Sequence, residues 1–558
     1  MSQHATRSKR GIGPVSQCLL FAWVILSLAT WVSAHEGHQH PAGKPEQLGT
    51  VDFAVSCNAE AQAQFQRAVA IQHSFWFEEA EKAFATVTVT DPGCAMGYWG
   101  IAMSLYHPLW EPPDATALQQ GWEAVVKAKA LGAKTDRERD YIAAVEAFYK
   151  DTDKRDHYTR ALAYEKAMEQ VYLRYPEDHE AAVFYALALD ATALPTDKTY
   201  ANQKKAGTIL EQVFTAQPNH PGVAHYIIHS YDYPPLADRA LAAARSYAKI
   251  APAVPHALHM PSHIFIRLGL WQEAIDSNRA SAAAAKEYGL KAFPGRAWFQ
   301  ELHALDYLVY AYLQGAQERE AKGILDELKV IQKAEPEDGI SAYAFTAIPA
   351  RYALERRAWT EAASLTLHPT TFPWSRYRWA EANVYFARAL GAARSGNPAS
   401  TQKEVEKLQS LRDSLAEAKQ SYWADQVEVQ RRAAAAWLAQ AEGKSEGALQ
   451  LMRSAAELED ATEKHPVTPG PIVPARELLG ELLLELKQPS QALNEFEALL
   501  RASPNRFNGL SGAARAAQLA GNAEKAHAYY AKLVSLCDHG DSTRVELTDA
   551  RTFLANRQ

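Results

Sequence analysis

The sequence predicts an all-α protein, a right-handed superhelical solenoid built from helix-turn-helix repeats. The first observation is a 3.6-residue apolar periodicity that begins near Ala59 and continues through most of the chain. The second is a spacing of 34 residues between equivalent side chains, which is typical of repeated helix pairs. This spacing relates three central alanines, Ala206, Ala240 and Ala274, and two pairs of histidines, His225 with His259 and His229 with His263.

The N-terminus has the pattern of an export signal. A basic stretch from Arg7 to Arg10 precedes an apolar run over residues 18–31, and the small residues 32–34 (VSA) form a cleavage site. The run is short for a membrane span, which needs about 20 residues. We therefore expect residues 1–34 to be a cleavable signal peptide and the mature protein to be periplasmic or secreted, with no membrane span.

Residues 35–58 are expected to form a flexible tail that begins with a histidine-containing stretch, HEGHQH. Such a stretch can hold a transition metal loosely, or it can be a plain polar linker. In an oxidising compartment Cys57 and Cys94 are candidates for a disulfide bond that closes the first repeat, with a contribution of about 3–4 kcal/mol. Cys537 would then remain unpaired and buried near the C-terminal helix.

The repeats follow in order from residue 59. A main solenoid is expected over 59–464, and a Pro-rich break over 465–474 opens a C-terminal pair of repeats within 465–558. In the first repeat Ala68, Ala80 and Phe84 supply the small and aromatic packing residues. The other expected elements are a second unit from Cys94, helix pairs over 115–150 and 155–194, the central 34-residue repeats, and less regular helices over 341–460.

These spacings resemble the tetratricopeptide repeat family over most of the mature chain. Five segments also resemble a group of largely uncharacterised exported bacterial proteins with that fold: DPGCAMGYWGIAMSLYHPLW, HYIIHSYDYP, HALHMPSHIFIRLGLW, HALDYLVYAYLQ and PGPIVPARELLGELLLE. The group implies no particular activity. In the repeat family, one face of each first helix lines a concave groove where ligands bind.

The resemblance places a set of polar side chains in this groove. The residues expected to bind a ligand are His256, Asp232, Arg267, His303, Asp306 and Tyr310. Histidines four residues apart on one helix face can chelate a metal, and a second pair on the next helix can complete the shell. The expected metal ligands are His225, His229, His259 and His263, with Zn²⁺ or Cu²⁺ as the ion.

Three interpretations of these histidines remain open: a metal site, a groove whose neutral rings bind a peptide or small molecule, and ordinary packing between repeats. Pro261 bears on the choice, because a proline inside a helix removes a backbone donor and can restart the helix. If the helix began only at Pro261, the chelating geometry of His259 with His263 would be lost.

The favoured function is an exported binding or scaffold module for a peptide, a protein or a small ligand, with or without the assistance of a metal. The alternative is a metal-dependent periplasmic enzyme that uses the same histidines. The net charge of −7 and the lack of a basic stripe argue against nucleic acid as a partner. The sequence contains no HExxH metalloprotease motif, P-loop, dinucleotide fingerprint, nucleophile elbow or CxxC motif.

Overall fold

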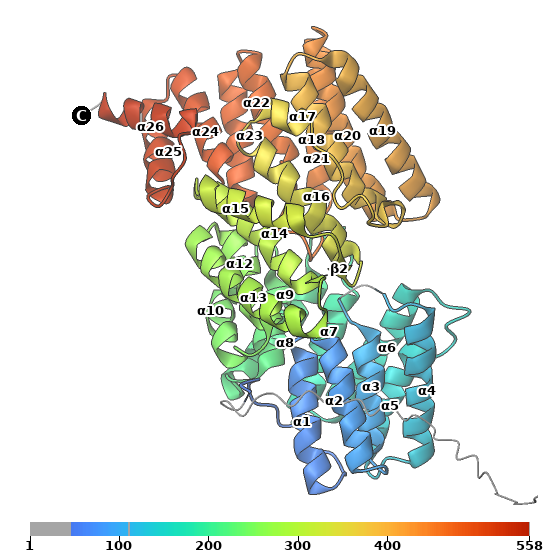
Figure 1. Ribbon diagram of the computed structural model, residues 1–558. Helices are drawn as coiled ribbons and strands as arrows, with labels where there is room; N and C mark the ends of the chain where they lie inside the picture. The colour runs from blue at the N-terminus through green and yellow to red at the C-terminus, as the bar shows by residue number, and fades with distance from the viewer. Residues whose placement is uncertain (1–45, 110–111, 557–558) are drawn as a thin grey trace, which may run out of the picture. The chain divides into compact units, whose positions relative to one another are not determined.

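The computed structural model describes residues 46–109 and 112–556, and over these residues the chain is a succession of helices joined by short turns (Figure 1). The predicted all-α class with tetratricopeptide-like helix pairs is confirmed, since consecutive helices pack against one another along the chain. The expected signal peptide and the histidine-containing start of the tail lie outside the described residues.

In the N-terminal part of the array every regular element of the described residues is an α-helix. They are α1 (Ala59–His73), α2 (Phe77–Thr90), α3 (Ala95–Tyr106), α4 (Ala115–Leu131), α5 (Asp136–Tyr149), α6 (His157–Arg174), α7 (His179–Ala191) and α8 (Ala201–Ala216).

The central part adds a short 3-10 helix and two two-residue strands that pair in parallel. Its elements are α9 (Pro221–Tyr231), η1 (Ala237–Ala240), α10 (Leu241–Ile250), α11 (Pro255–His259), α12 (Pro261–Leu268), α13 (Trp271–Ala292), β1 (Ala297–Trp298), α14 (Phe299–Gln314), α15 (Glu318–Val330), β2 (Ala334–Glu335), α16 (Gly339–Leu354) and α17 (Trp359–Ala363).

The C-terminal part is again helical. Its elements are η2 (Trp374–Arg376), α18 (Arg378–Arg394), α19 (Pro398–Glu417), α20 (Ser421–Ala441), α21 (Ser445–Asp460), α22 (Ala475–Glu485), α23 (Pro489–Ala502), α24 (Phe507–Leu519), α25 (Ala523–Leu536) and α26 (Val545–Ala555).

Small residues allow the paired helices to approach closely. A Cβ atom on Gly100 of α3 would overlap the ring of Phe84 on α2, and one on Gly480 of α22 would overlap the ring of Phe496 on α23. Both phenylalanine side chains are fully buried. Small residues facing aromatic rings thus form contact points both within a helix pair and between successive pairs.

Residues 46–58, the end of the segment expected to be flexible, pack against the first helices. Phe53 is fully buried, and its ring lies 5.3 Å from that of Phe65 and 5.5 Å from that of Trp99, measured between centroids. The segment that precedes α1 is therefore part of the packed core and not a flexible tail over residues 46–58.

The disulfide bond between Cys57 and Cys94 is present, with the two Cα atoms 5.1 Å apart. It links the chain just before α1 to the residue before α3 and so closes the first helix pair. Cys537 is free and buried, as predicted, in a small apolar cluster with Leu547 of α26.

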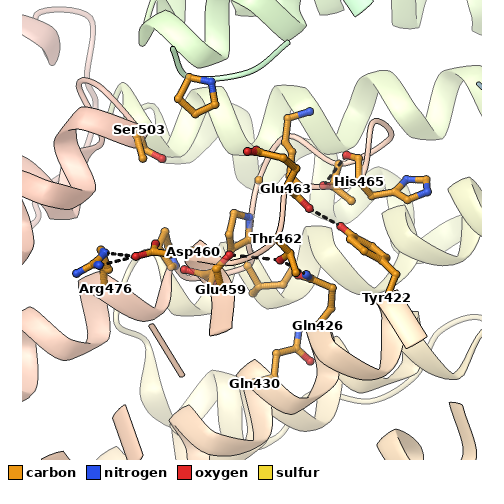
Figure 2. Close-up of a pocket in the computed structure, with 18 of the residues that line it drawn as sticks. Tyr422, Gln426, Gln430, Glu459, Asp460, Thr462, Glu463, His465, Arg476 and Ser503 are labelled. Carbon is orange, nitrogen blue, oxygen red and sulfur yellow. Dashed lines mark hydrogen bonds and ion pairs between the residues drawn. The ribbon is translucent and has the colours of Figure 1, made fainter. Parts of the chain in front are cut away.

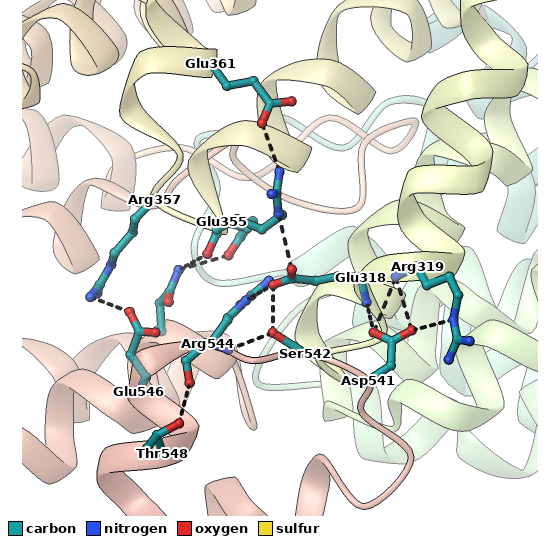
Figure 3. A network of polar contacts seen from close by, with 12 residues as sticks. Glu318, Arg319, Glu355, Arg357, Glu361, Asp541, Ser542, Arg544, Glu546 and Thr548 are labelled. Atoms are coloured by element: carbon teal, nitrogen blue, oxygen red, sulfur yellow. Dashed lines mark hydrogen bonds and ion pairs between the residues drawn. The ribbon is translucent and has the colours of Figure 1, made fainter.

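The C-terminal helices are tied to the middle of the chain by a polar network (Figure 3). The carboxylate of Asp541 accepts a hydrogen bond of 2.7 Å from the backbone N–H of Glu318 at the start of α15. Arg544 binds the side chain of Glu318 at 2.6 Å, and Arg357 binds Glu546 at 2.8 Å. The segment after residue 465 is therefore anchored on helices that precede it by more than a hundred residues.

None of the helices within the described ranges has the length and apolar character that crossing a bilayer would require.

Candidate functional site

Six histidines from four neighbouring helices gather in two groups of three, which we name the first and second triads. Within each triad, one nitrogen from every ring lies within 4.8 Å of the others. Helices α9, α11, α12 and α14 supply them. The first triad is His225, His229 and His256, and the second is His259, His263 and His303.

The two triads occupy equivalent positions in successive repeats. In each, two histidines four residues apart come from one repeat, and the third comes from the start of the next. The third histidines, His256 and His303, are 47 residues apart, as are Ala274 and Ala321, because the long α13 and the loop after it lengthen that repeat. The sequence prediction of one four-histidine site differs from this arrangement, since its members are divided between two triads. His256 and His303, expected to bind a ligand, complete them.

The distances between facing nitrogens are those of ligands around one ion. In the first triad, Nε2 of His225 lies 3.1 Å from Nε2 of His229 and 3.2 Å from Nε2 of His256. In the second triad, Nε2 of His259 lies 3.0 Å from Nε2 of His263. Nitrogens bound at about 2.0–2.1 Å to one tetrahedral ion lie roughly 3.3–3.4 Å apart.

Partners on the far side of three rings determine which nitrogen carries the proton. Nδ1 of His225 lies 2.7 Å from the carbonyl oxygen of His73, which can only accept, so this Nδ1 donates. Nδ1 of His259 donates to Oδ1 of Asn278 at 2.6 Å, since the amide nitrogen of Asn278 is used on the carbonyl of Ala274.

Nδ1 of His263 likewise donates to the carboxylate of Asp232 at 3.0 Å. In their neutral forms His259 and His263 therefore direct two unprotonated Nε2 atoms at each other. The hydroxyl of Tyr307, 3.3 Å from Nε2 of His263, is the nearest donor to that atom. Metal-binding histidines are commonly held in this way, with the remote N–H bound to a carbonyl or carboxylate.

Burial favours the neutral form of these rings. Desolvation lowers the pKa of His225 to about 3, and it lowers the pKa values of His229, His256, His259 and His303 well below the ordinary value. The pKa of His263 is lowered by burial too, against the opposing effect of Asp232. Neutral imidazole is the form that binds metal ions.

Pro261 does not have the effect on His259 and His263 that the sequence suggested. It ends α11 and begins α12, but Met260 between them keeps right-handed helical dihedral angles (φ −54°, ψ −34°). Because the chain keeps turning as a helix, the two rings stay on one face with their Nε2 atoms 3.0 Å apart.

An aromatic ring packs against each triad. The Phe75 ring centroid lies 4.4 Å from that of His225, 5.5 Å from that of His229 and 5.9 Å from that of His256. Phe75 has a left-handed backbone conformation (φ 53°), which costs energy for a bulky residue and is often found at functional sites. The Tyr307 ring lies 4.6–5.1 Å from the three rings of the second triad.

Asp232 connects the second triad to two cationic side chains, Arg267 and Lys464. The sequence placed Asp232 and Arg267 in one groove, and they are in contact. The carboxylate of Asp232 binds Nε of Arg267 at 2.8 Å and Nζ of Lys464 at 2.6 Å. Burial would raise the pKa of Asp232, but Lys464 and Arg267 outweigh it and hold that pKa well below the ordinary value. Burial in turn lowers the pKa of Lys464 to about 8.

Arg267 and Lys464 also line a cavity of about 330 Å³ (Figure 2). Tyr422 and His465 lie at one side of it, and Asp460 at the other. Trp423, another lining residue, stacks on Trp379 with centroids 3.8 Å apart. The cavity therefore combines aromatic surface with charged groups, two of which reach the second triad through Asp232.

Asp306 and Tyr310, predicted to share the groove with the histidines, make their polar contacts elsewhere. Asp306 lies 3.5 Å from Nε of Arg351, and burial raises its pKa to about 6. The Tyr310 hydroxyl accepts from Arg506 at 3.3 Å. Both share a face of α14 with His303, but they lie about 4.5 Å and 10.5 Å further along the helix axis, so they meet other neighbours.

A further buried group, His73, Glu180 and His220, was not singled out from the sequence. Glu180 accepts hydrogen bonds from Nε2 of His73 at 2.9 Å and Nε2 of His220 at 2.8 Å. The remaining Nδ1 atoms face the hydroxyl of Tyr226 and the N–H of Val223. One ligand atom from each of these residues also lies within 4.8 Å of the others, but every ring nitrogen has a hydrogen-bonding partner in the protein, so we assign no ion to this group. Its members are far apart in sequence and share no spacing that could have revealed it.

No protein-family model and no curated protein matches the chain. Among solved structures, human IFIT1 in a dimer with m7Gppp-AAAA is 12% identical, with 80% of this chain and 90% of that chain covered and a TM-score of 0.33. Yeast Tom70 is 11% identical, with 89% and 96% covered and a TM-score of 0.32. We draw no functional argument from these weak likenesses.

Proposed function

We propose that this chain is an exported helical-repeat protein that binds two transition-metal ions, one in each histidine triad. The observation that carries the proposal is the facing pair of Nε2 atoms of His259 and His263, 3.0 Å apart, whose Nδ1 atoms both contact acceptors on the far side. In neutral rings these contacts leave both Nε2 atoms unprotonated. Two lone pairs at this distance repel each other, and a cation between them turns the repulsion into two bonds. The equivalent first triad extends the argument to a second ion.

The donor set points to copper or zinc. All three ligands of each triad are imidazoles, which suit both ions, and copper(II) is bound most strongly among the common divalent metals. Three protein ligands leave one coordination position for another molecule, as in catalytic rather than structural zinc sites. The centre can therefore serve a binding function or a reaction.

Export is part of the proposal. It is supported by the signal-like pattern of residues 1–34 and by the disulfide bond between Cys57 and Cys94, since such bonds persist in oxidising compartments. Expression with the native N-terminus in a Gram-negative host, followed by fractionation, tests this. Recovery of the full-length protein only in the cytoplasm would contradict it.

Elemental analysis of untagged protein tests metal binding. We expect two equivalents of copper or zinc after dialysis, and one equivalent in a His259→Gln, His263→Gln double variant. The exposed His527 on α25 provides the control, because His527→Ala should retain both ions. Unchanged metal content in the double variant, or no retained metal in the parent protein, would refute the proposal.

The cavity beside the second triad supports a second candidate function, the binding of a small ligand or a peptide end. Its aromatic and charged lining suits a ligand with a planar apolar part and a polar group. Fluorescence of Trp379 and Trp423 during titration with a library of short peptides and aromatic acids would detect it. A signal that persists unchanged in Trp423→Leu would rule this cavity out as its source.

A further inference from the structure

We infer that the two triads form a single copper pair that binds dioxygen and reduces it to peroxide. This inference rests on the proposed metal-binding function and goes further by naming the metal, the arrangement and the small molecule. It is argued from the spacing of the triads, the charge of their donors and their burial.

The triads adjoin each other. Across the boundary between them, the ring centroids of His256 and His259 are 6.0 Å apart, and those of His229 and His263 are 6.2 Å apart. Within the second triad, the His263 and His303 centroids are 6.3 Å apart. The ring separations between the triads therefore fall within the range of 4.2–6.3 Å found inside the second triad. Two bound ions are then close enough to share a diatomic ligand.

The donors favour copper that alternates between the oxidation states copper(I) and copper(II). Both triads are composed of neutral imidazoles, with no carboxylate among the six ligands. A buried site without anionic ligands favours an ion of lower charge, because each additional charge must be stabilised away from water. Copper(I) accepts three nitrogen ligands, and the same imidazoles also bind copper(II).

The centre is buried except at one edge, and this burial limits its contact with water and with larger oxidants. His225 is fully buried and His256 is 2% exposed, whereas His229 is partly exposed and marks an edge of the centre. The ring of Phe75 covers the first triad, with all three imidazoles within 5.9 Å of its centroid. Dioxygen is small and apolar, so an apolar covering does not penalise its entry.

The step is balanced without a further reactant. Two copper(I) ions each give one electron to dioxygen, and the oxygen–oxygen bond falls from a double to a single bond. Peroxide and two copper(II) ions result, joined by new copper–oxygen bonds, and no proton is consumed. Reversal of the electron transfer releases dioxygen and restores copper(I).

The test loads the full protein with two equivalents of copper(I) under anaerobic conditions and then admits dioxygen. We expect uptake of one dioxygen per two coppers and a new near-ultraviolet charge-transfer band. We also expect little electron paramagnetic resonance signal, because the spins of two bridged copper(II) ions cancel. His303→Gln should hold one firmly bound copper, take up no dioxygen in this way and show a full copper(II) signal after oxidation.

The control His527→Ala should behave as the parent protein, and circular dichroism should show that His303→Gln is folded. Two bound coppers that take up no dioxygen, or that give two independent copper(II) signals after oxidation with a chemical oxidant, would overturn the inference while the proposed metal site stands. Retention of two zinc ions but no copper would have the same meaning. Absence of any bound metal would overturn the inference and the proposed function together.

Discussion

Replacing Asn278 by leucine should weaken metal binding at the second triad and leave the first triad unchanged. The amide oxygen of Asn278 holds the Nδ1 proton of His259 at 2.6 Å, and this contact directs the unprotonated Nε2 at His263. Leucine has a similar volume but cannot accept the proton. Loss of such a remote partner typically lowers metal affinity by about 10–100-fold, or about 1.4–2.7 kcal/mol.

A competition titration with a chromophoric chelator measures this effect on each equivalent separately. The first triad has its own partner, the carbonyl of His73, which the substitution does not touch. The variant should therefore bind one equivalent as tightly as the parent protein and the other about 10–100-fold more weakly. Equal weakening of both equivalents, or none of either, would refute the assignment of Asn278 to the second triad.

The matched control is Asn383→Leu. Asn383 is also a buried helical asparagine, and its side chain exchanges hydrogen bonds with Thr346 and Gln430 away from the triads. Both variants lose side-chain hydrogen bonds and should be destabilised by about 1–3 kcal/mol. Only Asn278→Leu should alter the metal titration, which separates a role in positioning His259 from a general loss of stability.

Three predictions concern stability. The Cys57→Ser, Cys94→Ser double variant should lose about 4 kcal/mol of unfolding free energy, because the bond closes a loop with a sequence separation of 37 residues; an unchanged denaturant midpoint would contradict this. Burial raises the pKa of Glu459 to about 8, so its contribution to stability is present below pH 4.5 and is lost as the pH rises through 8. Glu459→Gln should therefore be more stable than the parent protein by a few kcal/mol at pH 9 and equal to it at pH 4, as chemical denaturation at the two pH values will show. Glu477→Ala should cost about 1–3 kcal/mol, since it removes a carboxylate 2.6 Å from the fully buried Arg506 but leaves Glu355 paired with it at 2.7 Å; no measurable loss in thermal unfolding would exclude this role.

Much of the fold could be predicted because it depends on local spacing. The 34-residue interval between Ala206, Ala240 and Ala274 reports a helix pair that buries its small residues at each repeat. The pairs of histidines were found for the same reason, since the interval that repeats a packing residue also repeats its neighbours. The equivalence of His256 and His303 was visible as well, but only three-dimensional contacts show that each completes a triad with the preceding repeat.

Other contacts in the site could not be predicted from the sequence. Lys464 contacts Asp232 across 232 residues, and Phe75 covers histidines that follow it by 150 to 181 residues. No periodicity links such positions, because they meet through the packing of separate helices. The continuity of the helix at Pro261 was equally hidden, since it depends on the dihedral angles of Met260.

The sequence alone determined the helical class, the repeat interval and which histidines share a helix face, because these follow from periodicities of 3.6 and 34 residues that act over short stretches of chain. The tertiary structure decided that the histidines divide into two adjoining triads, that Asn278 and Asp232 hold their protons on the far side, and that Asp306 pairs with Arg351 instead. These are contacts between side chains on different helices. Their distances depend on how the helices pack, and the spacing of residues along the sequence does not determine that packing.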